Sequence, residues 1–223
     1  MISVAIDGPS GAGKSSLAKR LAADLGYVYV DTGAMYRSIG LYVLEAGKDV
    51  KNEDEVTALL PNIQIDLRYE NGSQHILLCG RDVSDTIRRE KVGMAASSVA
   101  AYPAVRAFLL EQQRALAQSQ NVLMDGRDIG TAVLPNATVK IFLTASSKAR
   151  AQRRQKELLE KGMQADFETV LKDIEQRDWQ DTHREAAPLR QAEDTVLVDT
   201  SELDFEESFE ALKKVILAKV KGE

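Results

Sequence analysis

The chain opens with a glycine-rich segment that lies directly after an apolar run and directly before an amphipathic stretch. Residues 8–15 read Gly-Pro-Ser-Gly-Ala-Gly-Lys-Ser, which fits the pattern G-x-x-x-x-G-K-S of a phosphate-binding loop (P-loop) in full. In such a loop the backbone N–H groups and the N-terminus of the following helix surround a phosphate. The segment therefore requires a strand before it and a helix after it, which constrains the whole architecture.

We expect this loop to hold a nucleoside triphosphate together with Mg²⁺. The hydroxyl of Ser15 is the expected ligand of the metal. Asp125 follows the apolar run 122–124, as does the carboxylate that lies near the metal in P-loop enzymes, although an aspartate there can equally form a simple turn. The residues expected to contact the triphosphate are Gly8, Pro9, Ser10, Gly11, Ala12, Gly13, Lys14, Ser15 and Ser16.

Short apolar runs alternate with longer amphipathic stretches along the chain, and this pattern favours a parallel sheet of about five strands covered by helices. The expected strands are residues 3–6, 27–30, 122–124, 139–143 and 196–198. The segment 63–83 differs, because its apolar residues alternate and Asn71-Gly72 is a hairpin-type turn, so it predicts a small antiparallel insertion. Helices are expected near 103–118, 147–161 and 166–183.

Composition limits the partners of this chain of 223 residues. Its formal net charge of −5 argues against a nucleic-acid partner, since proteins that bind nucleic acids normally carry a basic face. The first residues contain neither a basic region nor an apolar stretch long enough for a signal peptide or a membrane span. We therefore expect a cytoplasmic protein that binds small molecules and neither membranes nor nucleic acid. We also expect it to be a monomer.

Arginines follow two of the expected strands, at the edge where parallel sheets bind ligands. The segment 31–37 reads Asp-Thr-Gly-Ala-Met-Tyr-Arg, so Thr32 is placed to cap a helix whose first turns carry Arg37. Arg127 and Asp128 follow the next strand in the same way. Because guanidinium groups bind phosphate oxygens in pairs, these arginines predict a second, phosphorylated substrate beside the loop.

Two later rows of arginines each allow two interpretations. Arg177, Asp181 and Arg184 share one face of a helix, and such a row is either an ion-pair face exposed to water or part of a site. The arginines at 150, 153 and 154 follow the fourth strand. They either close over the triphosphate as a lid or only make a helix soluble. Spacing alone does not decide between these interpretations.

Taken in order, these segments resemble the bacterial cytidylate kinase family over essentially the whole chain. The resemblance rests on residues 6–14, residues 31–37, Asp82-Val83-Ser84, residues 99–106 (Val-Ala-Ala-Tyr-Pro-Ala-Val-Arg), residues 125–130 (Asp-Gly-Arg-Asp-Ile-Gly) and Ala187-Pro188-Leu189. It implies a nucleoside monophosphate kinase that transfers the γ-phosphoryl group of ATP to CMP or dCMP with Mg²⁺. It also implies a P-loop core over 1–32, 98–148 and 164–223, a monophosphate-binding domain over 33–97 and a short lid over 149–163.

The same resemblance implies a role for individual residues. It puts Ser97, Arg106 and Asp128 at the cytosine, Arg177 and Asp181 at the ribose, and Thr32, Arg37, Arg127 and Arg184 at the acceptor phosphate. The catalytic residues that it implies are Lys14, Arg127, Arg184 and Arg153, with Arg154 as the alternative lid arginine. No general base is expected, because a monophosphate oxygen is already anionic at neutral pH.

The chemistry of the base agrees with this reading of Asp128 and Arg106. Cytosine presents an exocyclic amine beside a ring-nitrogen acceptor, so the carboxylate can accept from the amine while the guanidinium donates to the ring. Uracil inverts both groups, and we therefore expect CMP and dCMP to be used well ahead of UMP. The alternatives are a P-loop kinase for another small acceptor and a regulatory NTPase, although the guanine-reading pattern Asn-Lys-x-Asp is absent from the sequence.

Overall fold

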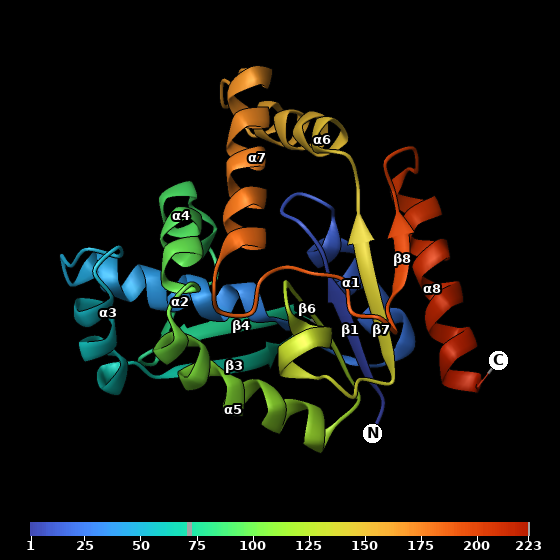
Figure 1. Cartoon of the computed structure of the whole chain (residues 1–223), viewed down its shortest axis with the longest axis horizontal. Coiled ribbons are helices and arrows are strands. Elements are labelled where there is room, and N and C mark those ends of the chain that lie inside the picture. The colour runs from blue at the N-terminus through green and yellow to red at the C-terminus, as the bar shows by residue number, and fades with distance from the viewer. Residues whose placement is uncertain (71–72, 223) are drawn as a thin grey trace.

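A parallel five-stranded sheet forms the centre of the molecule (Figure 1). It is seen in a computed structural model of the chain that describes residues 1–70 and 73–222. The strands lie in the order β2-β6-β1-β7-β8. Their bounds are Ser3–Asp7 (β1), Val28–Asp31 (β2), Val122–Gly126 (β6), Val139–Thr144 (β7) and Val196–Asp199 (β8). The five strands expected from the sequence are confirmed to within two residues at each end.

Helices cover both faces of this sheet. In chain order they are α1 (Lys14–Leu25), α2 (Thr32–Glu45), α3 (Glu53–Leu59), α4 (Glu90–Val99), α5 (Pro103–Ser119), α6 (Ser147–Glu160), α7 (Phe167–His183) and α8 (Phe205–Lys221). Two short 3₁₀ turns, η1 (Leu60–Asn62) and η2 (Thr86–Arg88), and one π-helix, η3 (Ile129–Val133), join them. The three later helices expected from the sequence correspond to α5, α6 and α7.

Apolar side chains decide which helix covers which face. On one face Leu123 and Ile141 pack with Leu21 of α1 and Leu212 of α8. On the other face Met124 belongs to a second cluster, which contains side chains of α5 and η3. The inner strands β1 and β6 are therefore buried on both sides, as parallel strands normally are. The sheet is held rigidly, and its carboxyl edge is a stable platform for a site.

The antiparallel insertion expected from the sequence is confirmed. It is a three-stranded sheet of β3 (Ile65–Glu70), β4 (Ser73–Leu78) and β5 (Arg81–Asp82). The turn expected at 71–72 lies outside the described residues. The insertion shares one apolar cluster with α2, α3, α4 and α5. That shared cluster fixes α2 and α4 against each other beside the carboxyl edge of the main sheet.

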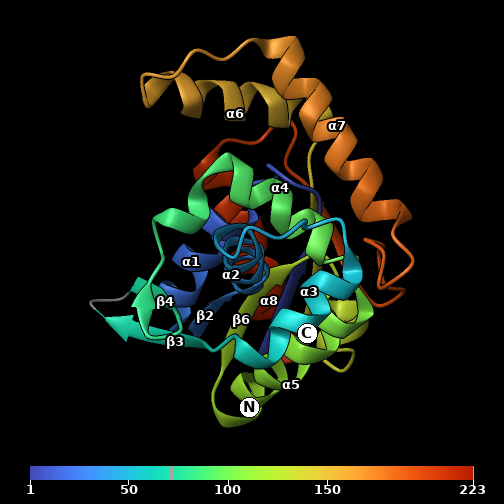
Figure 2. The ribbon, with the colours of Figure 1, turned by 90° about the vertical axis from the view of Figure 1, so that its left-hand side faces the viewer.

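The helix pair α6 and α7 projects from the rest of the molecule, and Figure 2 shows it standing above the sheets. A small cluster of Ala151, Val170 and Ile174 holds the two helices together. Asp166 caps α7, because its Oδ2 accepts a hydrogen bond from Thr169 N at 2.9 Å. This confirms the cap expected at Asp166. The cluster between α6 and α7 is separate from the larger apolar clusters of the core.

The expected cap of α2 is wrong. Asp31, and not Thr32, caps this helix, since Asp31 Oδ1 accepts from Ala34 N at 2.8 Å. Thr32 is the first helical residue, and its Oγ1 donates to the carbonyl oxygen of Asp125 at 2.7 Å. Both residue types make good caps, so residue type alone does not favour the earlier one.

No single helix within residues 1–70 and 73–222 has the length and apolar composition needed to cross a membrane. The pair α4 and α5 meets that test only when the two helices are counted together, and they are bent by 100° at the break between them.

The contact between α2 and α4 yields a test of the packing. A Cβ on Gly40 would lie 3.0 Å from Ala96 N and 3.1 Å from Ala95 Cβ. Because these atoms belong to a packed helix, we expect Gly40→Ala to lower the free energy of unfolding by about 1–3 kcal/mol. Gly93→Ala on α4 is the control, since its Cβ would meet only the flexible end of Arg177. Urea unfolding compares the two variants, and equal stability would contradict this packing.

Candidate active site

The P-loop leaves β1 in a conformation that depends on glycine. Gly8 has φ 152°, and a Cβ there would lie 1.9 Å from the carbonyl oxygen of Leu143, so the loop passes against the backbone of β7. Gly13, the residue before α1, has φ 85°, in the left-handed region that favours glycine. The loop expected from the sequence therefore has the strand before it, the helix after it and the backbone freedom that a phosphate cradle needs.

Lys14 lies folded across this loop. It is 5% exposed, and its Nζ donates to the carbonyl oxygen of Pro9 at 2.6 Å. Burial lowers the pKa of Lys14 well below its usual range, and the nearby charge of Arg127 adds to the effect. A phosphate in the loop would favour the charged ammonium, so the electrostatics of this lysine suit an anionic ligand.

Ser15 and Asp125, the two residues expected near the metal, are hydrogen-bonded to each other. Ser15 Oγ donates to Asp125 Oδ2 at 2.7 Å, and the other carboxylate oxygen accepts from Tyr29 Oη at 3.0 Å. Burial, followed by the charge of Asp31, raises the pKa of Asp125 to about 6. Sequence reasoning missed Tyr29, which has no distinguishing pattern within its strand.

This pair of oxygen donors fits Mg²⁺. A hydroxyl and a carboxylate are hard ligands, and Mg²⁺ commonly takes one or two protein groups and completes its shell with phosphates and water. Within the described part of the chain there is no cluster of three or more His, Cys, Asp or Glu side chains that could hold a metal alone. Ser15 and Asp125 thus suit an ion that arrives with the nucleotide.

Asp128 forms a buried cluster with two arginines from distant parts of the chain. Its Oδ2 accepts a short hydrogen bond from Arg106 Nη2 of α5, and its Oδ1 accepts from Arg184 Nη2 at 3.2 Å. The three side chains are between 5% and 13% exposed. Arg184 also donates to the carbonyl oxygen of Ala187. Asp128 and Arg106, both expected at the base, are thus in contact with Arg184, which is expected at the acceptor phosphate.

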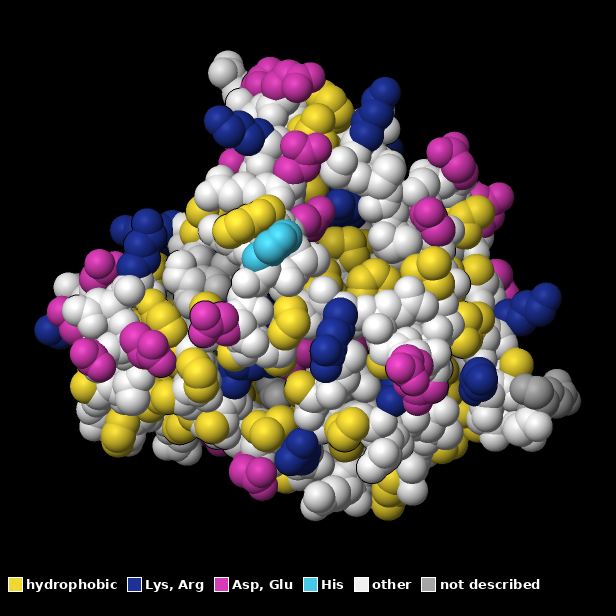
Figure 3. Space-filling model, in the orientation of Figure 1, with side chains coloured by type: hydrophobic (Ala, Val, Ile, Leu, Met, Phe, Trp, Pro, Cys, Tyr) yellow, Lys and Arg dark blue, Asp and Glu magenta, His cyan; other side chains and the backbone are white. Residues whose placement is uncertain are grey.

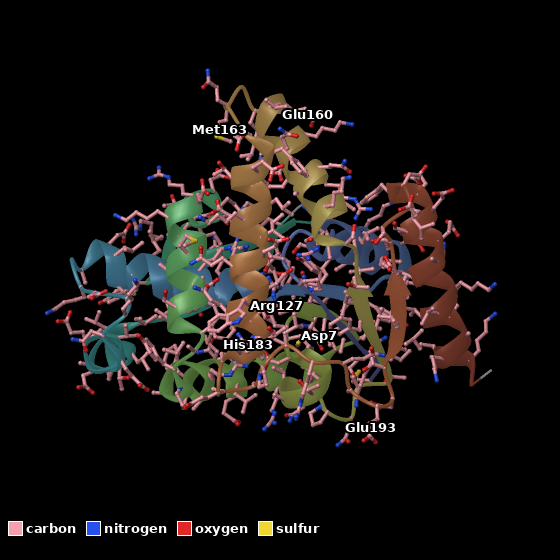
Figure 4. The ribbon with its side chains drawn as sticks, turned by 45° about the horizontal axis from the view of Figure 1, so that its top comes forward. Asp7, Arg127, Glu160, Met163, His183 and Glu193 are labelled. Atoms are coloured by element: carbon pink, nitrogen blue, oxygen red, sulfur yellow. The ribbon has the colours of Figure 1, made fainter. Side chains whose placement is uncertain are left out.

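The neighbouring Arg127 pairs with α7. Its Nε donates to Asp181 Oδ2 at 2.6 Å, and Asp181 is 8% exposed. Although burial opposes ionisation, the charge and hydrogen bond of Arg127 hold the pKa of Asp181 below its usual value. The row on α7 is therefore not an ion-pair face exposed to water, because its carboxylate is buried. Figure 4 shows Arg127 near the middle of the molecule.

Arg37 and Arg177 add positive charge that the described residues do not neutralise fully. Arg177 Nε is buried, and within residues 1–70 and 73–222 it has no hydrogen-bond partner. Burial lowers the pKa of both arginines, and the charge of Arg127 lowers both further. Since the buried Nε of Arg177 lacks a partner among the described residues and both guanidinium groups are partly buried, the site is suited to a bound anion. Ser97 lies close by on α4, where its hydroxyl and Arg177 Nη2 approach the same carbonyl oxygen, that of Gly93.

The two candidate lid arginines, Arg153 and Arg154, each have partners outside the P-loop. Arg153 donates to the carbonyl oxygens of Thr200 and Leu203, which ties α6 to the turn after β8. Arg154 forms an ion pair with Glu157 at 2.8 Å on the same helix. Both arginines expected near the transferring phosphate thus have other partners in this conformation.

Arg150 is the arginine of this row that reaches the P-loop. Its Nη1 donates to the carbonyl oxygen of Ser10 at 2.8 Å, and its guanidinium pairs with Asp178 of α7. It is 4% exposed. The flanking alanines at 149 and 151 were the available sign that this turn of α6 is the buried one. Acidic and basic side chains are mixed over the face of the molecule seen in Figure 3.

Comparison with known proteins adds a family to this geometry. A family model described as cytidylate kinase matches residues 4–218. The cytidylate kinase of Geobacillus kaustophilus is 49% identical over 215 residues, which cover 96% of this chain and 96% of that protein. That of Caldicellulosiruptor saccharolyticus is 48% identical over 215 residues, covering 96% and 94%. That of Thermosipho melanesiensis is 47% identical over 218 residues, covering 98% and 98%.

Among solved structures, a shikimate kinase from Bacteroides thetaiotaomicron aligns with 100% of this chain and 99% of its own at a TM-score of 0.48 and 14% identity. This likeness is too distant to inform the site.

The raised pKa of Asp125 predicts how stability depends on pH. The folded value of about 6 exceeds the usual value of 3.8, so the folded state holds an extra proton between these pH values. This group therefore stabilises the fold at low pH and loses that contribution as the pH rises through about 6. As the pH rises from 4.5 to 7, we expect the free energy of unfolding of Asp125→Asn to increase by about 2 kcal/mol relative to that of the unsubstituted protein. Urea unfolding at each pH measures this difference. A constant difference between the two proteins would contradict this reading.

Proposed function

The chain belongs to the cytidylate kinase family, and we propose that its site transfers the γ-phosphoryl group of ATP to CMP or dCMP, releasing ADP and CDP or dCDP. One observation carries the assignment of the acceptor. A buried carboxylate, Asp128, pairs with the guanidinium of Arg106, whose side chain is only 13% exposed, near the P-loop. This pair offers an acceptor and a donor in the arrangement that cytosine requires.

On the donor side, the backbone of residues 8–16 and the ammonium of Lys14 hold the triphosphate. Release of Lys14 from the carbonyl oxygen of Pro9 frees its Nζ for the phosphates. Ser15 and Asp125 hold Mg²⁺, which neutralises charge on the phosphates when it is bound. The left-handed backbone of the loop and the meeting of Ser15 with Asp125 support these roles.

On the acceptor side, Thr32, Arg37 and Arg127 bind the phosphate of CMP. Arg177 and Asp181 bind the ribose, and Ser97 assists at the base. The unpaired Nε of Arg177 and the lowered pKa of Arg37 support this placement, because both indicate cationic groups that lack full neutralisation. Arg184 contacts Asp128, so we propose that it links the base to the phosphate side of the acceptor site.

Catalysis in this proposal consists of positioning and of charge neutralisation. Lys14, Arg127 and Arg184 stabilise the negative charge of the transferring group, and closure of α6 and α7 excludes water. Arg153 would have to leave Thr200 to join them, whereas Arg150 already contacts the loop. We therefore propose Arg150 as the residue that couples the lid to the P-loop. A proton acceptor is not required, because the attacking oxygen of CMP is ionised.

We also propose that the enzyme works in the cytoplasm as a monomer, with no nucleic-acid or membrane partner. The net charge of −5 supports the absence of a nucleic-acid partner.

The acceptor preference is tested by coupled ADP release with ATP and Mg²⁺, comparing CMP, dCMP, UMP, AMP and no acceptor. We expect kcat/KM for CMP and dCMP to exceed that for UMP by about two orders of magnitude or more, because UMP leaves buried polar groups unpaired. Equal turnover of UMP and CMP would contradict the pairing of Asp128 and Arg106 with the base. CMP turnover no faster than the acceptor-free rate would remove CMP as the acceptor.

The lid coupling is tested by Arg150→Met with Arg154→Met as its control. The two substitutions remove the same charge from the same helix, but only Arg150 contacts the P-loop. We expect Arg150→Met to raise the KM for ATP by about tenfold, on the scale of a charged hydrogen bond. Arg154→Met should remain within about twofold of the unsubstituted enzyme, as for an exposed ion pair. Similar effects of both variants would remove the special role of Arg150.

A further inference from the structure

Asp7 ends β1, and its carboxylate satisfies two backbone groups in another part of the chain. Asp7 Oδ1 accepts from Ile129 N and Oδ2 accepts from Gly130 N, both at 2.7 Å. The side chain is 5% exposed. Ile129 and Gly130 are the first two residues of the π-helix η3, so Asp7 caps this helix from the neighbouring strand. Figure 4 shows Asp7 near the middle of the molecule.

This cap is unusual because an aspartate already precedes the helix. Asp128 is the N-cap residue of η3, the position from which an aspartate normally accepts the first free N–H groups with its own carboxylate. Asp128 makes no such bond. Its two oxygens accept instead from Arg106 and Arg184. Asp7 accepts from Gly130 N, which is one of the N–H groups from which an N-cap aspartate normally accepts, so this group is not available to the carboxylate of Asp128.

We propose that Asp7 is a positioning residue for base selection. By capping η3 in place of Asp128, it keeps the carboxylate of Asp128 turned toward Arg106 and Arg184, where cytosine is distinguished from uracil. The inference rests on the proposed role of Asp128 at the base. It also joins the two substrates structurally, since Asp7 is directly followed by Gly8, the first residue of the P-loop.

The surroundings of Asp7 leave it little freedom to take another arrangement. Burial, to which the nearby charge of Asp128 adds, raises the pKa of Asp7 to about 6, while its two backbone hydrogen bonds and Lys14 oppose this rise. A Cβ on Gly130 would lie 3.4 Å from Asp7 Oδ2 and 3.2 Å from Lys140 Cδ. Gly130 therefore fits between the side chains of Asp7 and Lys140. The ammonium of Lys140 forms an ion pair with Asp194.

Asp7→Asn tests the cap with the least change of shape. The amide keeps one acceptor oxygen but sets an NH₂ group against the second N–H, so the end of η3 draws the carboxylate of Asp128 back as a cap. We expect the ratio of kcat/KM for CMP to that for UMP to fall by about tenfold, the scale of one hydrogen bond. The KM for CMP should rise more than the KM for ATP. A purely structural role of Asp7 would lower activity with both acceptors and leave their ratio unchanged.

Asp128→Asn and the double variant separate this inference from the proposed function. If Asp7 acts through Asp128, adding Asp7→Asn to Asp128→Asn should change the CMP-to-UMP ratio by less than about twofold, because interacting residues are not additive. Asp128→Asn with an unchanged ratio would overturn the proposed base reading and the inference with it. Loss of selectivity in Asp128→Asn but not in folded Asp7→Asn would overturn the inference alone.

Two further variants complete the experiment. Asp194→Asn is the control, because it removes the partner of Lys140 on the other side of Gly130 without touching the cap. It should keep the original ratio, and a loss equal to that of Asp7→Asn would overturn the specific role of Asp7. Should Asp7→Asn fail to fold, Asp7→Glu keeps the carboxylate but moves it by one methylene group relative to Ile129 N and Gly130 N. Selectivity lost in folded Asp7→Glu would support the inference, and selectivity retained would overturn it.

Discussion

Parallel pairing of three strands is the constraint on which the rest of the site depends. Ile6 and Asp31 both pair with Asp125, so β1, β2 and β6 end at one level. Each strand then delivers a different functional segment to the same edge: the P-loop, the start of α2, and Gly126-Arg127-Asp128. Because the sheet is buried on both faces, these segments have little freedom to move apart. The position of the site follows from this register.

Charge balance decides what that edge can bind. Asp128 and Asp181 neutralise Arg106 and Arg127, while Arg177 and Arg37 retain positive charge that burial makes costly. In the proposed function a substrate phosphate supplies the missing negative charge, and domain closure would strengthen that attraction by excluding water. Binding of the acceptor and assembly of the catalytic charges would then be one process. This agrees with a reaction in which the protein supplies position and electrostatics rather than a proton acceptor.

Local patterns in the sequence predicted the helices and strands well. They predicted contacts between residues that are distant in the sequence less well. The P-loop, the strands and the cap at Asp166 follow from short-range spacing and turn chemistry. The contacts of Arg150, Tyr29 and Asp7 do not, because each joins residues far apart in the sequence. The cap of α2 was misplaced by one residue because two adjacent side chains are both good caps. Sequence spacing also did not show whether the row Arg177, Asp181 and Arg184 on α7 faces water. The burial of Asp181 shows that it is not an exposed ion-pair face.

Titration calorimetry of CMP, cytidine and UMP into the nucleotide-free protein tests the central claim most directly. In the proposed function the arginines at this edge bind the phosphate while Asp128 and Arg106 bind the base, so removing either feature of the ligand should weaken binding. We expect CMP to bind most tightly, with cytidine and UMP each weaker by about tenfold or more, as for the loss of a buried polar contact. Cytidine or UMP binding as tightly as CMP would contradict the account.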